Sequence, residues 1–137
     1  MRQIPAPEPQ GERVDRIAQR IVTLAYAHSM FLDKARELKD LLPSFYRMAV
    51  EDTTSQVATA AQMQAAYVVN LDTMESLQRE FDELIKQLKI EILRKSQLSM
   101  QEAIRHAQQK GDEEETMRVM EEFRVLSQKI DELQSDL

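Results

Sequence analysis

Residues 104–126, IRHAQQKGDEEETMRVMEEFRVL, contain the pattern that decides the fold of the last third of the chain. They predict a helix over residues 97–110, a break at Gly111-Asp112 and a second helix over residues 113–136. Glycine is favoured where a helix ends in a left-handed residue, and an aspartate followed three positions later by a glutamate forms a capping box. Acids also fill the first turn after the break, where the helix dipole favours negative charge. We therefore expect a charged helical hairpin.

The two predicted helices of this hairpin share an apolar seam. With the turn at Gly111, the expected facing positions are Leu93 with Lys129–Ile130, Gln97–Leu98 with Val125–Leu126, and Ile104 with Met117–Val119. Met117, Met120 and Phe123 together are more apolar side chains than a two-helix seam needs. We expect some of them to remain partly exposed, either as a solubility liability or as a binding patch.

The rest of the chain predicts a linker and a bundle of helices. Residues 1–11 alternate proline with small or polar residues and are typical of a semi-rigid linker or its remnant. The expected domains are therefore a linker at 1–11, a helical bundle at 12–95 and the hairpin at 96–137. Helical patterns cover residues 12–28, 30–41, a short segment after Pro43, a segment from Asp52 or Thr53 to Tyr67, and a long segment from Thr73 to about Gln109. The fold class predicted is all-α: a small helical bundle joined by a long helix to a C-terminal helical hairpin.

Apolar residues spaced by three and four predict the inward faces of the bundle helices. The main expected core positions are Ile17, Ile21, Leu24, Phe31, Ala35, Phe45, Tyr46, Met48, Val50, Met74, Leu77, Phe81, Leu84 and Leu88. The segment ending at Tyr67 is rich in alanine, which permits close helix approach and favours a core position. Asp72 with Glu75 predicts a second capping box at the start of the long helix.

Composition excludes several classes of protein. The chain has no cysteine, so disulfides, thiol catalysis and cysteine-zinc sites are absent. No apolar run is long enough to cross a bilayer and no signal peptide is recognisable, so we expect a cytoplasmic protein with no membrane partner. The formal net charge of −6 divides into −1 for residues 1–96 and −5 for residues 97–137. An acidic hairpin repels phosphate, so direct nucleic-acid binding is not expected from it, and its charges either solvate an exposed surface or flank a binding surface.

The titratable residues predict no catalytic, cofactor or metal site. His28 and His106 are far apart and do not have metal-ligand spacing. No glycine-rich phosphate loop, nucleophile elbow or Glu-x-x-His motif of a di-iron bundle occurs. Adjacent carboxylates such as Asp82-Glu83 diverge by about 100° on a helix and do not converge on a substrate. We therefore expect a non-catalytic protein that carries no cofactor.

Three segments resemble the C-terminal domain of bacterial DNA primase, the DnaG family. ERVDRIAQRIVTL (12–24) is similar to the opening helix of that domain, and LQREFDELIKQL (77–88) is similar to its long helix. Residues 104–126 are similar to its terminal hairpin. The order of elements also agrees: linker, small bundle, long helix and hairpin with a Gly-Asp turn. The family often has a proline after the first helix, where this chain has Ala27-His28-Ser29-Met30.

The resemblance implies a role in protein binding, without the zinc-binding and polymerase regions of primase. The family domain docks on the N-terminal domain of the hexameric replicative DNA helicase, recruits primase to the replication fork and modulates helicase activity. The resemblance also implies a partner-binding surface on the hairpin. The residues expected there are the apolar Ile104, Met117, Met120 and Phe123, with Arg118, Glu121 and Arg124 at the rim. We expect the chain to be monomeric or only weakly self-associating. The alternative is a free-standing helical scaffold or adaptor protein unrelated to replication.

Overall fold

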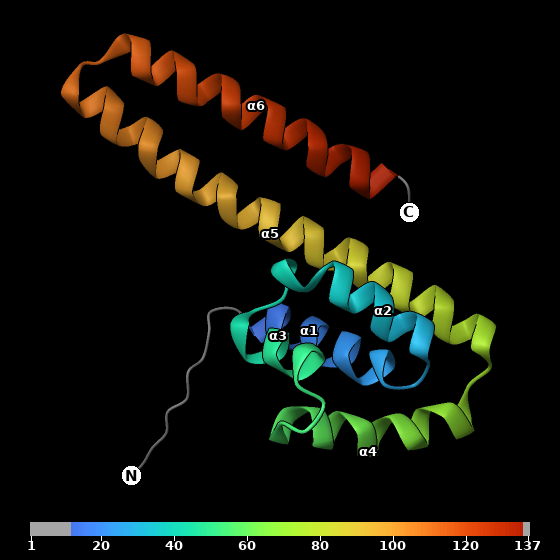
Figure 1. Ribbon diagram of the computed structural model, residues 1–137. Helices are drawn as coiled ribbons and strands as arrows, with labels where there is room; N and C mark the ends of the chain where they lie inside the picture. The colour runs from blue at the N-terminus through green and yellow to red at the C-terminus, as the bar shows by residue number, and fades with distance from the viewer. Residues whose placement is uncertain (1–11, 136–137) are drawn as a thin grey trace. The chain divides into compact units, whose positions relative to one another are not determined.

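The protein is all-α, as the sequence predicts. A computed structural model describes residues 12–135, so the predicted linker at 1–11 lies outside the described residues. The described helices are α1 (Glu12–Ala25), α2 (Ser29–Glu37), a short 3-10 turn (Lys39–Leu41), α3 (Ser44–Glu51), α4 (Gln56–Leu71), α5 (Met74–Lys110) and α6 (Glu113–Ser135). Figure 1 shows their order along the chain. The chain divides into two compact units after Leu88, and α5 contributes residues to both.

The first unit is a helical bundle built around α1. The apolar positions of α1 recur at spacings of three and four, and Ile17, Ile21 and Leu24 are buried beneath the neighbouring helices. Thr23 is the buried polar residue of this helix, and its hydroxyl donates to the backbone carbonyl of Gln19 at 3.1 Å. Helices α2, α3 and α4 all contact α1 (Figure 1). The bundle therefore has one core, to which α1 contributes the largest set of residues.

The first turns of α5 complete this core. Leu77, Phe81 and Leu88 are each only 1% exposed. The Phe81 ring stacks on the ring of Phe31 from α2, with centroids 4.7 Å apart and planes 20° from parallel. Leu84, predicted as a core position, is only half-buried, and Met74, also predicted inward, is exposed. Leu84 lies on the edge of the buried stripe, because α5 packs the face that carries 77, 81 and 88.

An ion pair also joins α1 to α5. The Arg20 guanidinium donates to both carboxylate oxygens of Glu80, at 2.6 and 3.1 Å. This hydrogen bond to Glu80 raises the pKa of Arg20, partly opposed by burial. The pair is about one-third exposed on each side, so its contribution to stability is reduced by solvent screening. Its two-pronged geometry adds a directional contact between α1 and the first turns of α5.

Two helix starts differ from the sequence prediction. Helix α4 begins at Gln56, later than the predicted Asp52 or Thr53, because the Asp52 carboxylate accepts hydrogen bonds from the amide and hydroxyl of Thr54. Ser55 caps α4 instead, accepting from the amide of Ala58 at 3.1 Å. Helix α5 is capped by the Thr73 hydroxyl, which accepts from the amide of Ser76 at 3.1 Å. Asp72, the predicted cap, is the residue that ends α4, so the predicted Asp72–Glu75 box was wrong.

Helix α3 presents a different face from the predicted one. Ala49 and Val50 are fully buried, and Tyr46 is half-buried. Phe45 and Met48 are exposed by 61% and 56%, so their assignment to the core was wrong. A helix of eight residues has little more than two turns, and its apolar residues cover most of its circumference. Its sequence pattern therefore does not choose one face.

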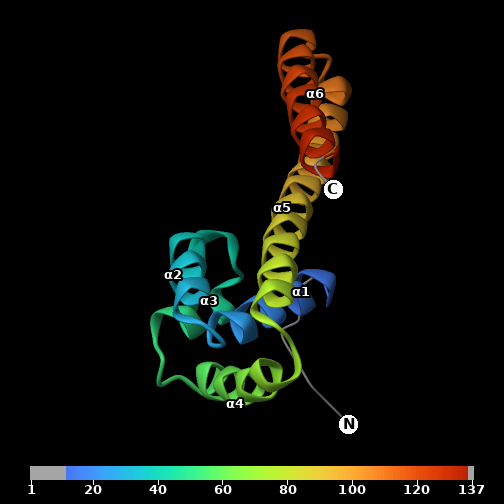
Figure 2. The same ribbon diagram turned by 90° about the vertical axis from the view of Figure 1, so that its right-hand side faces the viewer.

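The second unit is the helical hairpin. It begins at Lys89 and contains the remainder of α5 with α6, which lie side by side and antiparallel (Figures 1 and 2). The sequence predicts that the hairpin starts at residue 96, whereas in the structure the second compact unit starts at Lys89. Because α6 continues to Ser135, its antiparallel partner positions on α5 extend to residues ahead of 96.

Candidate protein-binding surface

The turn of the hairpin is built as the sequence predicts at Gly111. Gly111 has a φ of +74°, in the left-handed region that favours glycine. Its amide donates to the carbonyl of Gln108 at 3.1 Å, and the amide of Asp112 donates to the carbonyl of Ala107 at 3.0 Å. This pair of bonds is a Schellman motif, which satisfies carbonyls at the end of α5. The turn therefore fixes the direction in which α6 leaves α5.

Asp112 caps α6, although only half of the predicted capping box forms. The Asp112 carboxylate accepts from the amide of Glu115 at 3.0 Å. The Asp112 amide already donates to Ala107, and the Glu115 carboxylate binds Arg118 at 2.5 and 3.1 Å. The reciprocal bond from Glu115 to the cap is thus replaced by an ion pair on the surface of α6.

The hairpin seam has close to the predicted register. Val119, Leu126 and Ile130 of α6 are buried, as is Ala107 of α5. A hydrogen bond from the Gln97 amide to the Ser127 hydroxyl, at 2.8 Å, crosses the seam. The predicted partners of Gln97 were Val125–Leu126, so the observed contact lies one residue further along α6. The seam buries one stripe of α6 and leaves the other faces of this helix to solvent.

An apolar row leads from that seam to the outer face of α6. Met117 is 71% exposed, Met120 is 50% exposed and Phe123 is half-buried. Residues three apart on a helix are rotated by about 60° from one another, so the three side chains form an oblique ridge across α6. We call Met117, Met120 and Phe123 the α6 ridge. The surplus of apolar side chains predicted from the sequence therefore lies on the surface of α6.

Charged side chains of α6 are already paired, and Glu121 and Arg124 are the pair on the side of the α6 ridge. Arg118 donates to Glu115 and to Glu122, the latter at 2.7 Å, and Arg124 donates to Glu121 at 2.6 and 3.1 Å. The hydrogen bond to Glu115 raises the pKa of Arg118, and the hydrogen bond from Arg124 lowers the pKa of Glu121. Both arginines keep their charge under all relevant conditions. Exposed pairs of this kind exchange partners at small cost, because solvent screens them.

The structure places the seven predicted site residues in two groups. Met117, Arg118, Met120, Glu121 and Arg124 are exposed on α6. Ile104, on α5, and Phe123 are half-buried. Ile104 therefore supports the hairpin more than it offers a contact, while Phe123 lies at the border between seam and surface. Their assignment to partner binding stays a prediction.

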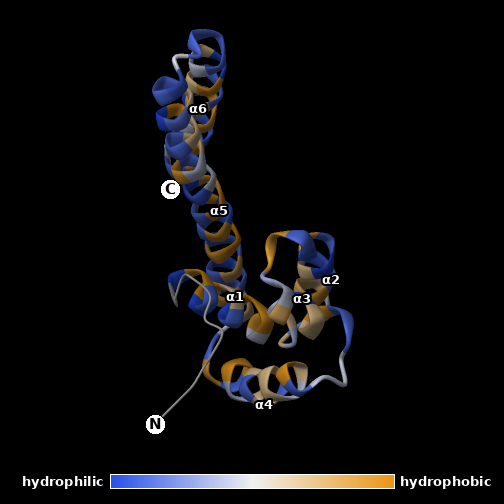
Figure 3. Ribbon diagram, turned by 90° about the vertical axis from the view of Figure 1, so that its left-hand side faces the viewer, coloured by the Kyte–Doolittle hydropathy of each residue, from blue (hydrophilic) through white to orange (hydrophobic). Residues whose placement is uncertain are grey.

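Other exposed apolar residues were missed by sequence reasoning. In the hairpin these are Leu98, 63% exposed, and Val125, 39% exposed. In the bundle, α4 buries Ala58, Ala61 and Ala65, as its predicted core role requires, but its other side exposes Met63, Tyr67 and Leu71 by 67%, 72% and 80%. Figure 3 shows apolar colour along much of α4. The signal was present as a long stretch without charge, which is unusual for a helix with a solvent-exposed face.

Within residues 12–135, no three histidine, aspartate or glutamate side chains gather in a group that could hold a metal ion. In the same range, every helix is too short or too polar to span a membrane. No protein-family model matches the chain, and neither a curated protein nor a solved structure matches it. The fold and surfaces thus define a class, an all-α bundle with a hairpin that exposes apolar side chains.

Proposed function

We propose that this chain is a non-catalytic protein-binding domain of the primase type, whose hairpin docks on the N-terminal domain of a hexameric replicative helicase. In this role it recruits primase to the replication fork and modulates the helicase. The observation that carries the proposal is the α6 ridge, an apolar row in which Met117 and Met120 are exposed, with paired charges on the same helix. The resemblance of residues 104–126 to the terminal hairpin of the primase domain supports the choice of partner.

The geometry of α6 suits helix-to-helix recognition. Apolar anchors inside a charged border are the usual arrangement of a protein interface, in which the centre excludes water and the border sets specificity. Methionine is flexible and polarizable, so Met117 and Met120 adapt to the shape of a partner groove. The Schellman turn and the seam hold α6 in place before binding, which lowers the entropy lost on association.

The negative charge of the hairpin favours a protein partner over a nucleic acid. Helix α6 carries seven acids and three bases. A partner surface with complementary positive charge gains from this field, and the gain is seen mainly in the association rate. Phosphate is repelled by the same field. In this proposal, other parts of a primase therefore make the contacts with DNA.

Calorimetric titration of the helicase N-terminal domain into the full chain tests the proposal. We expect a saturable complex, and we expect Met120→Glu to raise Kd by about tenfold or more, because it places an unpaired charge at the centre of the interface. The matched control is Leu98→Glu, at another exposed apolar residue of the hairpin, on α5, which should leave Kd unchanged. Absence of binding by the unaltered chain, or equal binding by Met120→Glu, would contradict the proposal.

The exposed face of α4 favours one other candidate, a free-standing helical scaffold or adaptor protein unrelated to replication. A scaffold needs more than one apolar surface, and α4 supplies a second, outside the hairpin. The same titration separates the two candidates. Self-association of the chain, together with the absence of binding heat in the titration with the helicase domain, would support the scaffold.

A further inference from the structure

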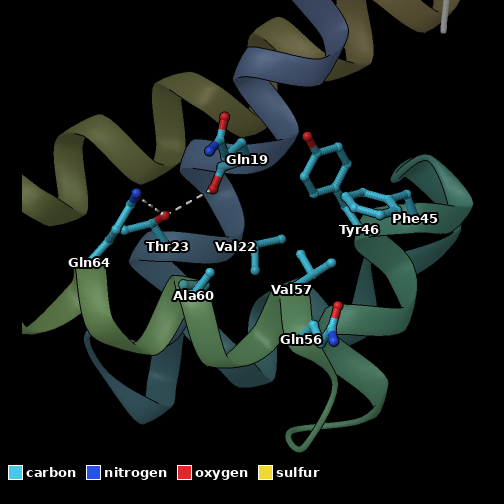
Figure 4. Close-up of a pocket in the computed structure, with 10 residues that line it drawn as sticks. Gln19, Val22, Thr23, Phe45, Tyr46, Gln56, Val57, Ala60 and Gln64 are labelled. Carbon is cyan, nitrogen blue, oxygen red and sulfur yellow. Dashed lines mark hydrogen bonds between the residues drawn. The ribbon is translucent and has the colours of Figure 1, made fainter. Parts of the chain in front are cut away.

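A groove lies between α1, α3 and α4 in the bundle unit. It has a volume of about 280 Å³. Val22 of α1 and Val57 and Ala60 of α4 line it together with the rings of Phe45 and Tyr46 from α3 (Figure 4). None of its ten lining residues is charged. The bundle thus has a neutral, largely apolar groove beside an aromatic pair.

The groove has the chemical character of a site for a proline-rich peptide. The rings of Phe45 and Tyr46 meet edge to face, with centroids 5.1 Å apart and planes at 90°, and Phe45 is 61% exposed. Gln19, Gln56 and Gln64 add side-chain amides, each of which has two N–H donors. Polyproline II peptides bind in aromatic-lined grooves. Their carbonyls have no internal hydrogen bonds and accept from donors of this kind.

Residues 1–11, MRQIPAPEPQG, have the composition of such a peptide. The prolines at 5, 7 and 9 favour polyproline II, which has three residues per turn. At that period one face carries Met1, Ile4, Pro7 and Gln10, and a second face carries Gln3, Ala6 and Pro9. The two charged side chains, Arg2 and Glu8, both fall on the third face. The pattern therefore predicts two neutral faces and one charged face.

We propose that residues 1–11 dock in this groove as a polyproline II helix. Ile4 and Pro7 then face the groove beside the rings of Phe45 and Tyr46, and the glutamine amides of the groove donate to the carbonyls of the segment. The neutral faces meet an uncharged groove, while the charged face stays in water and keeps its hydration. Docking also covers the exposed ring of Phe45.

The segment is long enough to reach the groove from the start of α1. Gln19 and Thr23 line the groove and lie about 10 and 16 Å along the helix from Glu12, at 1.5 Å per residue. At about 3.1 Å per residue in polyproline II, Pro7 lies about 16 Å and Ile4 about 25 Å along the chain from Glu12. Gly11, directly before α1, permits the reversal of direction that returns the segment along the helix. Pro7 therefore comes level with the groove.

Covalent attachment selects this segment over a second copy or a free partner. A short flexible tether gives an effective concentration in the millimolar range, so a contact too small for a stable dimer is sufficient. A second copy brings a net charge of −6 against the same charge, whereas residues 1–11 carry one arginine and one glutamate. The groove belongs to the first unit and the α6 ridge to the second, so this inference does not depend on helicase binding.

Fluorine NMR of the full chain, with fluorotyrosine in place of tyrosine, tests the proposal. Tyr46 lines the groove, whereas Tyr67, 72% exposed on α4, does not and is the internal control. Ile4→Ser combined with Pro7→Ser removes the apolar face of the segment and should shift the Tyr46 signal alone. The matched pair Arg2→Gln with Glu8→Gln alters the charged face and should leave both signals in place. An unmoved Tyr46 signal in the first variant, or equal shifts in both variants, would overturn the proposal.

A synthetic peptide of residues 1–11 tests whether the segment itself is the occupant. Added to the Ile4→Ser, Pro7→Ser chain, it should return the Tyr46 signal toward its original position, with half of the change at about 1 mM or below, because a docked tether requires a Kd below its effective concentration. The same peptide should have less effect on the unaltered chain, where the tethered segment competes for the groove. A peptide with the same two serines should have no effect.

Two results of these titrations would refute the docked segment. One is a Tyr46 signal that the peptide does not restore at about 5 mM, which is above the effective concentration of a short tether. The other is a Tyr46 signal that moves when the unaltered chain is diluted from about 1 mM to about 10 μM, which would assign the groove to a second copy. All four substituted positions lie outside residues 12–135, and circular dichroism verifies that the helix content is unchanged.

Discussion

Replacing Phe81 with alanine is expected to destabilise the bundle severely. Phe81 is 1% exposed, and its ring stacks on Phe31 with centroids 4.7 Å apart. Truncation of a fully buried phenylalanine costs about 3–5 kcal/mol through lost transfer energy and the cavity left behind. The aromatic pair itself contributes about 0.5–1.5 kcal/mol of that total. Since a domain is stable by only about 5–15 kcal/mol, Phe81→Ala should remove a large share of the margin.

Urea denaturation followed by tyrosine fluorescence measures this loss in the bundle alone. All three tyrosines belong to residues 1–88 and the chain has no tryptophan, so the hairpin does not contribute to the signal. Phe81→Leu should cost about 1–2 kcal/mol, because it keeps most of the volume and loses the stacking. Leu84→Ala, at a half-buried position, should cost less than Phe81→Ala. A loss below about 1 kcal/mol for Phe81→Ala would show that the ring is not a core element.

Three further outcomes follow from local geometry. Gly111→Ala should destabilise the hairpin by roughly 1–2 kcal/mol in thermal melts followed by circular dichroism, because a Cβ at φ +74° is strained although it meets no neighbour within 4 Å. Asp112→Ala should cost about 1 kcal/mol in the same assay through loss of the α6 cap, whereas an unchanged melt would mean that the cap is not needed. The hydrogen bond from Lys39 lowers the pKa of Glu51, and the hydrogen bonds from Thr54 lower the pKa of Asp52. Both carboxylates therefore stabilise the fold at a pH above their unfolded pKa values of about 4. This stabilisation is lost as the pH falls through the lower pKa values of the folded state. Melting temperature should therefore drop on acidification below about pH 4, and Glu51→Gln should make the drop smaller; an identical pH profile would exclude Glu51 as a contributor.

Features governed by neighbouring residues were predictable from the sequence. The hairpin turn is specified locally: Gly111 has the expected left-handed conformation and Asp112 caps α6, although Glu115 does not complete the predicted capping box. The all-α fold follows from helix-forming composition and spacing. The buried faces of α1 and α2 also follow, because Ile17, Ile21 and Phe31 stand out from polar neighbours. In each of these cases the local signal is strong and has few competing solutions.

The features that the sequence did not predict are of two kinds. Some depend on which of two neighbouring residues caps a helix, and others belong to helices that are apolar on most sides. Asp52 was a plausible helix cap, but its carboxylate accepts hydrogen bonds from Thr54 instead. At the start of α5 the Thr73 hydroxyl is the cap, and the neighbouring Asp72 ends α4. Phe45 was assigned inward because α3 is apolar on several sides. Helix α4 has the same difficulty, since its alanines and larger apolar residues surround it and give no clear polar face. Which side of such a helix is covered depends on the tertiary packing, which periodicity does not specify.

The candidate site on α6 was also predictable only in part. The number of apolar residues on α6 indicated an excess over the seam, and the exposure of Met117 and Met120 agrees with that expectation. Spacing alone did not decide whether Phe123 lies in the seam or on the surface, and the structure places it half-buried at the border between them. The pairing of Arg118 and Arg124 within α6 follows from spacings of three and four, which place acids beside each arginine.

Methyl NMR of the methionine-labelled chain, titrated with the N-terminal domain of the replicative helicase, tests whether the α6 ridge is the surface that binds the helicase. The methionines report separate surfaces, with Met117 and Met120 on the α6 ridge and Met63 on the exposed face of α4, all at least half exposed. We expect the Met117 and Met120 signals to shift or broaden on binding, while the Met63 signal stays in place. Binding that shifts Met63 and leaves Met117 and Met120 unchanged, or a titration in which no methionine signal changes, would contradict this expectation.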